Sequence, residues 1–449
     1  MSRWMIAALT LTLGCAGFSP SAQAADEPLA RPNILFILSD DQRWDTIHAL
    51  GNPEIKTPAL DGLVARGFSF GNAYCQGSMV GAVCLPSRTM IATGRSLWRI
   101  PKNLNAKQAP PGVPLLPALL NEAGYATFHS GKGGNACKYA NAAFQTNRET
   151  QQNPNSTVEN AGHVLDFLSK HDGAQPFFVY LAPPVPHDPR IAPPEYLKLY
   201  EAQQLSLSKN FLERHPFDNG DLAIRDELLA PIPRTPDEMR NHLRDYYATI
   251  SHFDAQVGRI LQTVADRGWS ENTIVIYASD QGLAVGGRHG LMGKQNLYEH
   301  VKPPLLIAGP GVPHGASNAL VYLYDLFPTI LDLAGAKTPD VIEGKSLLPI
   351  AQGKREKVRD SLLGAYKDCQ RMVRDDRWKL IVYRTPGERH TQLFDLQTDP
   401  DELHNLADEP AHRVQRERLE TLLSAERKAF GDPIDFDADL PAVEAKAKR

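Results

Sequence analysis

The sequence predicts an α/β fold in which a large, mostly parallel or mixed sheet is sandwiched between helices. Four short apolar runs lack the alternation of a half-exposed strand, as expected for strands buried on both faces of a sheet. They span residues 33–38, 177–182, 273–279 and 304–309. Amphipathic segments lie between them, and this alternation is typical of a sheet covered by helices on both sides.

Four amphipathic segments are predicted to be helices. They span residues 57–67, 115–124, 157–171 and about 236–268. The first has Thr57 as its N-cap and Gly67 as its stop signal. In the last, apolar residues recur three and four positions apart from Met239 to Val264, which places them on one face of the helix. We expect that face to join the core.

After Gly353 the pattern changes to that of short antiparallel strands. These strands are predicted over residues 361–366, 371–383 and 392–396, and a charged helix is predicted from about 410 to 430. We therefore predict a large α/β domain over residues 25–344 and a smaller α+β subdomain with a C-terminal tail over residues 345–449. Residues 101–114 and 184–236 are expected to form loops that shape a substrate cleft.

Residues 1–24 have the pattern of a secretory signal peptide. Arg3 precedes an apolar run that ends at Phe18, and Ala22-Gln23-Ala24 suits a signal peptidase. The run is shorter than the roughly 20 apolar residues of a membrane span. Cys15 lies in a poor lipoprotein motif, so a lipid anchor is not expected. We predict a periplasmic or secreted protein without a membrane span.

The composition narrows the class of protein. The chain has 449 residues, 42% of them hydrophobic, which suffices for a large buried core. A formal net charge of −4 gives no overall attraction to nucleic acid, so none is expected as a partner. Without the leader, the cysteines are Cys75, Cys84, Cys137 and Cys369. Such low cysteine use argues against a disulfide scaffold and leaves room for at most one disulfide if Cys84 has another role.

Acidic residues follow two of the predicted strands directly. Asp40 and Asp41 follow the first strand, and Asp280 and Gln281 follow the strand at 273–279. Ligands bind beyond the carboxyl ends of strands in open α/β sheets, so these side chains are expected at one edge. Carboxylate and amide oxygens suit a hard divalent cation such as calcium or magnesium. The alternative is that each acid only caps a turn.

Cys84 opens the pentapeptide Cys-Leu-Pro-Ser-Arg, and Thr93-Gly94-Arg95 follows it. A thiol with an ordinary pKa near 8.5 is mostly protonated at neutral pH, so it would need a nearby base or cation to react. No Cys–His–Asn pattern of the protease kind is recognisable. The pentapeptide and the Thr-Gly-Arg resemble those of the formylglycine-dependent sulfatases, an arylsulfatase-like family of the alkaline phosphatase superfamily.

The resemblance covers essentially the whole mature chain in the family's order. Its other motifs are Asp40-Asp41, Gly131-Lys132, Pro186-His187, the Ser-Asp-x-Gly at 279–282, and the segments 289–299, 325–335, 343–349 and 392–407. These motifs together identify residues 25–344 as a sulfatase catalytic domain.

The resemblance implies catalytic roles for Cys84, Arg88, Lys132, His187 and Lys294. A separate maturation enzyme would oxidise Cys84 to Cα-formylglycine, and the hydrated aldehyde would attack the sulfur of a sulfate ester. Lys132 and Arg88 would hold the hydrated aldehyde. His187 or Lys294 would bind sulfate oxygens and protonate the departing alcohol.

The resemblance also implies a metal ion, calcium or alternatively magnesium. Its ligands would be Asp40, Asp41, Asp280, Gln281 and the residue derived from Cys84. His289 and Asn135 are further candidates for contacts with the substrate. For His289, packing within a turn is the alternative.

One position departs from the family pattern. The family usually has Gly-Lys-x-His, whose histidine assists release of the bound sulfate, but here Gly134 stands at that place. Asn135 cannot accept a proton at neutral pH. His129 might replace the base from the strand end, or it might simply pack. We predict slow but real turnover, with a burst of the first product.

The sequence thus predicts an exported hydrolase, a sulfatase that acts on a sulfated carbohydrate such as a sulfated polysaccharide. Its expected partners are the saccharide substrate and the formylglycine-generating maturation enzyme. One alternative is a phosphonate or phosphate ester hydrolase of the same superfamily. The other is a catalytically weak homologue that binds sulfated glycans.

Overall fold

The computed structural model describes residue 1, residues 31–436 and residue 438. The predicted signal peptide therefore lies outside the described residues, apart from Met1. The described residues from Arg31 onward form one compact unit.

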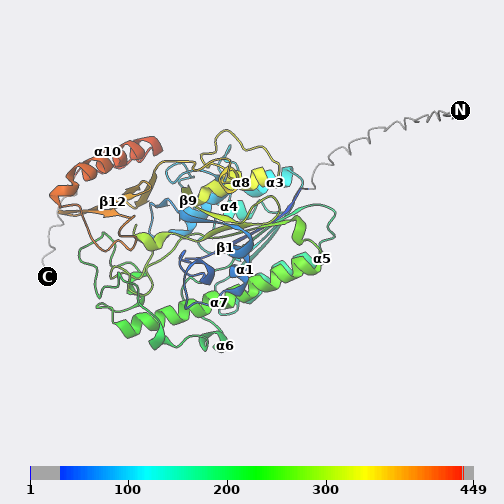
Figure 1. The fold of residues 1–449 in the computed structure, drawn as a ribbon, viewed down its shortest axis with the longest axis horizontal. Helices are drawn as coiled ribbons and strands as arrows, with labels where there is room; N and C mark the ends of the chain where they lie inside the picture. The colour runs from blue at the N-terminus through cyan, green and yellow to red at the C-terminus, as the bar shows by residue number, and fades with distance from the viewer. Residues whose placement is uncertain (2–30, 437, 439–449) are drawn as a thin grey trace. The chain divides into compact units, whose positions relative to one another are not determined.

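An eight-stranded mixed sheet forms the centre of this unit (Figure 1). The strand order is β5-β4-β6-β1-β7-β8-β2-β9. The strands are β1 (Asn33–Ser39), β2 (Phe68–Tyr74), β4 (Ala126–Lys132), β5 (Thr146–Thr150), β6 (Phe177–Ala182), β7 (Thr273–Ser279), β8 (Leu305–Ala308) and β9 (Gly315–Tyr322). Only β8 runs antiparallel to its neighbours among these strands. The predicted α/β fold class is confirmed.

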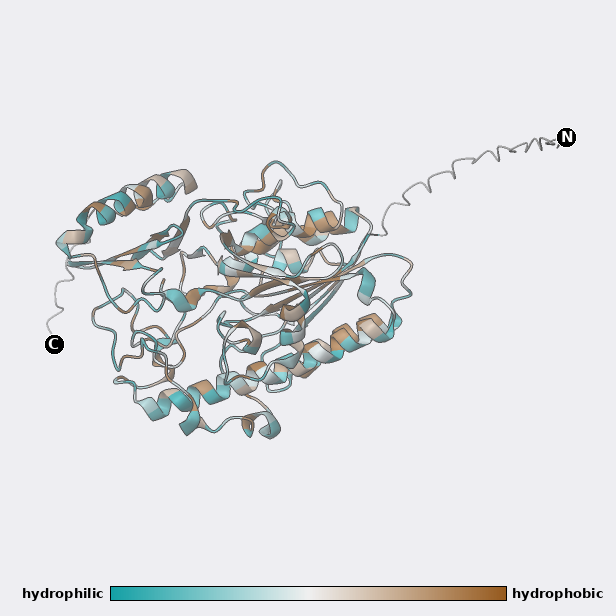
Figure 2. Ribbon diagram, in the orientation of Figure 1, coloured by the Kyte–Doolittle hydropathy of each residue, from teal (hydrophilic) through white to brown (hydrophobic). Residues whose placement is uncertain are grey.

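Alternate residues of the central strand β1 enter two separate cores, one on each face of the sheet. Ile34 and Phe36 join one core, and Leu35 and Ile37 join the other. The second core is completed by α1 (Pro58–Arg66), α5 (Ser156–Lys170) and α7 (Pro236–Asp266). The first is completed by α2 (Cys84–Thr93), α3 (Leu116–Glu122) and α8 (Leu326–Leu333). Figure 2 shows the central strands mostly in the hydrophobic colour and α7 banded in both colours.

A second sheet of five strands has the order β13-β12-β11-β10-β3. Its strands are β10 (Leu362–Tyr366), β11 (Gln370–Arg374), β12 (Trp378–Thr385), β13 (Glu388–Asp395) and the short β3 (Gly77–Ser78). The first four pair antiparallel, and β3 pairs parallel with β10. Leu419 and Leu423 of α10 (Arg413–Phe430) pack on this sheet. The boundary near residue 344 stays a prediction.

The predicted helices and strands match the observed ones closely where their patterns are long or strongly apolar. The strands at 177–182 and 273–279 are β6 and β7, and the long helix is α7. The strands β2, β3, β4, β5 and β9 were not predicted, and the segment predicted as one strand over residues 371–383 is divided between β11 and β12. The loop at 184–236 contains only short turns of helix, among them α6 (Pro194–Leu197). Other short α-helices are α4 (Lys138–Asn141) and α9 (Leu348–Ala351).

Candidate active site

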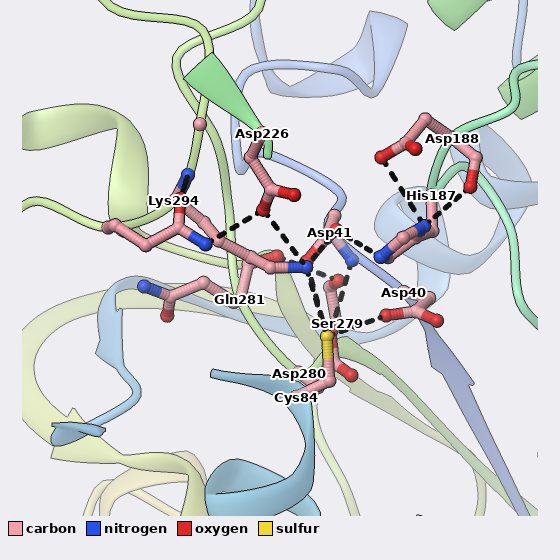
Figure 3. Close-up of polar contacts among 12 residues, drawn as sticks. Asp40, Asp41, Cys84, His187, Asp188, Asp226, Ser279, Asp280, Gln281 and Lys294 are labelled. Carbon is pink, nitrogen blue, oxygen red and sulfur yellow. Dashed lines mark hydrogen bonds and ion pairs between the residues drawn. The ribbon is translucent and has the colours of Figure 1, made fainter. Parts of the chain in front are cut away.

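Two adjacent parallel strands bring three carboxylates to one edge of the large sheet (Figure 3). β1 and β7 are paired up to Ser39 and Ser279, so Asp40 and Asp280 leave the strands side by side. The backbone N–H of Asp41 donates to Oδ1 of Asp280 at 3.1 Å. All three acids are buried. The two predicted strand ends therefore meet, as expected.

Helix α2 brings the pentapeptide to the same edge. It begins at Cys84, so residues 84, 87 and 88 lie on one side of its first turn. The Ser87 hydroxyl donates to the Asp280 carbonyl oxygen at 2.7 Å, and Arg88 Nε donates to Asp280 Oδ2 at 2.8 Å. The spacing within Cys-Leu-Pro-Ser-Arg thus aims three polar side chains at the strand ends.

The Cys84 thiol lies among charged groups. Its sulfur is 3.1 Å from Asp40 Oδ1, 3.6 Å from Asp41 Oδ1 and 3.2 Å from Lys294 Nζ. Burial raises the pKa of this thiol well above its ordinary value, and Asp280, Asp40 and Asp41 raise it further. The thiol is therefore protonated at neutral pH, and it is a poor nucleophile in this form.

Cations pair with the carboxylates from several parts of the chain. Lys132, at the end of β4, binds Asp40, and Lys294 Nζ donates to Asp41 Oδ2 at 2.5 Å. Burial opposes ionisation of Asp40, but Lys132 and Arg88 hold its pKa well below the usual range. Burial and the charge of Asp40 raise the pKa of Asp280 to about 6.

Four of the five predicted metal ligands form a group that could hold a divalent cation. Ligand atoms of Asp40, Asp41, Cys84 and Asp280 all lie within 4.8 Å of one another. The Oε1 atom of Gln281 is buried and has no hydrogen-bond partner among the described residues. Buried polar atoms are almost always paired, so an unpaired amide oxygen in the residue after Asp280 makes Gln281 a candidate calcium or magnesium ligand.

His187 lies in the segment after β6 and faces the carboxylate group. Its Nε2 atom is 3.7 Å from Asp41 Oδ2, and its Nδ1 atom forms a hydrogen bond of 2.7 Å with the Asp188 carbonyl oxygen. Figure 3 shows the ring between Asp41 and Asp188. The five predicted catalytic residues are thus brought together by this arrangement.

Three polar residues near the site were not singled out in the sequence. Arg225 holds the Asp188 carboxylate with both terminal nitrogens, at 2.5 and 3.1 Å. It also donates to Asp226, whose Oδ2 lies 3.9 Å from Lys294 Nζ. These residues belong to the long stretch at 184–236, which has no periodicity. The position of Asp188 directly after His187 is the only sequence signal that could have pointed to them.

The two residues predicted to contact the substrate, His289 and Asn135, lie in different surroundings from the five predicted catalytic residues. His289 bonds Glu299 at 2.9 Å and stacks on Tyr298, so it pairs with a different carboxylate from those around Cys84. Asn135 is exposed, with a φ of +50°. Their roles as substrate contacts stay predictions.

His129 packs against neighbouring side chains, which is the alternative to a role as the missing base. Its ring lies against the rings of Phe144 and Tyr180, and Nδ1 bonds Asn147 at 2.7 Å. Burial lowers the pKa of His129 to about 4, which makes it a weak base. The described cysteines, Cys75, Cys84, Cys137 and Cys369, are all free and buried.

Two family models match the chain. The model described as Sulfatase matches residues 32–336, and the model described as N-sulphoglucosamine sulphohydrolase, C-terminal, matches residues 287–429. The chain is similar to the N-acetylglucosamine-6-sulfatase of Homo sapiens, with 31% identity over 77% of this chain and 69% of that protein. It is also similar to an ulvan-active sulfatase of Formosa agariphila, with 26% identity over 93% of this chain and 84% of that protein.

Solved structures share the fold. One is a protein in complex with its substrate D-glucosamine-2-N,6-O-disulfate, with a TM-score of 0.75, 22% identity and coverage of 91% of this chain and 100% of that chain. Another is the phosphonate monoester hydrolase of Agrobacterium radiobacter, with a TM-score of 0.74, 19% identity and coverage of 89% and 96%.

Proposed function

Because the chain belongs to the sulfatase family and is a sulfuric ester hydrolase, we propose that it releases sulfate from a sulfated carbohydrate outside the cytoplasm. We further propose that the reaction uses a Cα-formylglycine made from Cys84. The carbohydrate substrate is supported by the names of two relatives, an N-acetylglucosamine-6-sulfatase and an ulvan-active sulfatase.

The setting of Cys84 is the observation that carries this proposal. A buried thiol beside three carboxylates has its pKa raised, so it cannot supply a thiolate nucleophile at neutral pH. The Cys84 sulfur lies at the start of a buried helix, 3.2 Å from Lys294 Nζ. This place suits an uncharged side chain that carries hydroxyl groups once it is hydrated. Conversion to formylglycine would give such a side chain.

A divalent cation fits the same group. Asp40, Asp41, Asp280, Gln281 and the converted residue 84 would hold it, and it would supply positive charge for the oxygens of the reacting sulfate. Calcium is our first choice because three carboxylates and an amide suit its flexible, all-oxygen coordination, and magnesium is the alternative.

The chain's own residues would bind the ester and move the proton. Lys132 and Arg88, already paired with Asp40 and Asp280, would hold the converted side chain. Lys294 would bind a sulfate oxygen. The hydrogen bond from His187 to Asp188 leaves Nε2 on the site's side, from which it would protonate the departing alcohol.

Export is proposed from the pattern of residues 1–24. Among the described residues, no helix combines the length and the apolar composition that crossing a bilayer requires. A periplasmic or secreted location would bring the enzyme to polymeric glycans. The proposal requires a formylglycine-generating enzyme as a maturation partner.

Peptide mass spectrometry over residue 84 tests the conversion. Protein produced with a maturation enzyme is expected to carry an aldehyde in place of the thiol and to hydrolyse nitrophenyl sulfate when calcium is present. The Cys84→Ala variant should do neither. An unaltered thiol in active protein would contradict the proposal.

Because a phosphonate monoester hydrolase shares this fold, hydrolysis of phosphonate or phosphate esters is a second candidate function. Faster turnover of a nitrophenyl phosphonate or phosphodiester than of nitrophenyl sulfate would favour that function. Retained binding of sulfated glycans by converted protein that releases no sulfate would instead indicate a catalytically weak binder.

A further inference from the structure

Arg190 has a guanidinium edge without a partner. Its Nε and Nη2 atoms are buried, and neither has a hydrogen-bond acceptor among the described residues. These two atoms form one edge of the guanidinium plane, the edge that can donate two parallel hydrogen bonds to a carboxylate or sulfate. Buried hydrogen-bond donors nearly always have an acceptor in proteins, so we expect this edge to donate to a bound ligand.

Arg190 lies at the wall of the reaction site. It follows His187 by three residues, and its guanidinium carbon is 5.6 Å from the centre of the Tyr246 ring. The Tyr246 hydroxyl donates to the Asp41 carbonyl oxygen at 2.7 Å. Burial lowers the pKa of Arg190, and the nearby carboxylates, led by Asp188 and including Asp41, oppose this effect. Arg190 is therefore within electrostatic reach of the catalytic carboxylates.

The neighbouring carboxylates are already bound by other groups. Asp188 accepts two hydrogen bonds from Arg225, and Asp41 accepts one from Lys294 at 2.5 Å. Asp226 accepts from Arg225 at 2.7 Å and from Gln295 at 2.8 Å. Figure 3 shows Asp41, Asp188, Asp226 and Lys294 around His187. Arg190, by contrast, forms no ion pair with any of the described residues, and its Nε and Nη2 atoms have no acceptor among them.

We propose that Arg190 binds a second anionic group of the substrate, a carboxylate or a second sulfate close to the ester that is hydrolysed. The inference rests on the proposed sulfatase function and specifies its substrate class. No hydrogen bond to the described residues holds the Nε–Nη2 edge in place, so the side chain can turn toward the bound saccharide. Arg190 thereby selects saccharides that carry at least two anionic groups near one another.

Calorimetric binding to the full chain tests this selection. The Cys84→Ala background prevents turnover, and calcium is present throughout. Two ligand pairs are compared, glucosamine 6-sulfate with glucosamine 2-N,6-O-disulfate, and a galactose monosulfate with its disulfate. In the better-binding pair, the disulfate is expected to bind about tenfold more tightly, the size of one charge-assisted bidentate contact. Arg190→Gln should bring this ratio to about one, and Arg190→Lys should retain part of it.

Arg244→Gln is the matched control. This half-buried arginine lies on α7 two residues before Tyr246, and its guanidinium binds the adjacent Asp245 at 2.8 Å. It should leave the ratio unchanged. A wild-type ratio near one in both pairs, or a ratio that survives Arg190→Gln, would overturn the inference. Absence of nitrophenyl sulfate turnover by the matured protein would contradict the proposed sulfatase function and would leave the binding ratio to be judged separately.

Discussion

At the scale of single residues, Gln281 gives a test of the cation site that needs no activity. In the metal-free protein its buried Oε1 has no partner among the described residues, and an unmade hydrogen bond costs roughly 1–3 kcal/mol. Gln281→Leu should therefore raise the metal-free stability by about 1 kcal/mol. It should also weaken calcium binding about tenfold, because one oxygen ligand is lost. Urea unfolding and calcium titration measure the two effects.

Gln281→Glu is the control for this prediction, because it keeps a ligand oxygen. It should retain or strengthen calcium binding. If the leucine variant binds calcium as well as the wild type does, Gln281 is not a ligand.

Gly134 gives a second prediction at this scale. The family usually has a histidine here, and a Cβ atom at Gly134 would meet nothing within 4 Å. Gly134→His should therefore fit, supply the missing base, raise kcat at least about tenfold and remove the burst of first product. Stopped-flow measurement with nitrophenyl sulfate checks both. Gly134→Ala fills the same space without a base, so an equal gain in both variants would argue against a proton-transfer role.

The residues of the candidate site fall into two groups, those that the sequence could predict and those that it could not. Asp40, Asp280 and Cys84 follow a strand or begin a helix, so local pattern and the rule for parallel strands place them together. Arg190 and Arg225 lie in a segment of 53 positions, 184–236, whose path is set by tertiary contacts. No periodicity records such contacts, which is why these residues emerge only from the structure.

At the scale of elements, α1 shows a cap supplied from another helix. The predicted N-cap, Thr57, makes no side-chain capping bond; its hydroxyl donates to Asp61 at 3.0 Å. Asp254 of α7 accepts from the backbone N–H groups of Ala59 and Leu60 at 3.1 and 2.8 Å instead. The sequence places the start of α1 correctly, but it cannot indicate a capping group that lies almost 200 residues away.

This cap predicts a pH dependence of stability. Burial raises the pKa of Asp254 to about 6, above the value near 3.8 of an unperturbed carboxyl. The folded state then holds a proton more tightly than the unfolded state, so this group's contribution to stability falls as pH rises from about 4 to 6. Asp254→Asn removes the titration. Between pH 4 and 7 the wild type should lose up to about 3 kcal/mol relative to the variant.

Urea unfolding of both proteins across this pH range measures the difference. Asp266→Asn, at an exposed site on the same helix, is the control. Parallel pH profiles of the wild type and Asp254→Asn would show that folding does not raise the pKa of Asp254.

At the scale of the whole molecule, the two sheets meet at β3. The Ala365 N–H donates to the Gln76 carbonyl oxygen at 2.9 Å, and the Lys367 N–H donates to the Ser78 carbonyl oxygen at 2.7 Å. The C-terminal strands therefore complete their sheet with residues that lie a few positions before Cys84. A strand of two residues has no periodicity, so the sequence predicts the antiparallel sheet but not its link to the catalytic segment.

Gly77 provides the test of this link. Its φ is +109°, and an added Cβ would lie 1.8 Å from the Ala365 carbonyl oxygen, so Gly77→Ala must separate β3 from β10. Gly112 also has a positive φ, of +76°, but open space around it, so Gly112→Ala should cost only about 1 kcal/mol of backbone strain. We expect Gly77→Ala to cost about 3 kcal/mol or more, as large single-site effects do. Hydrogen exchange read by mass spectrometry should then quicken in β10 and in the segment around Cys84 together. Faster exchange confined to β10 would mean that the C-terminal sheet opens independently of the catalytic part, and that the site does not depend on it.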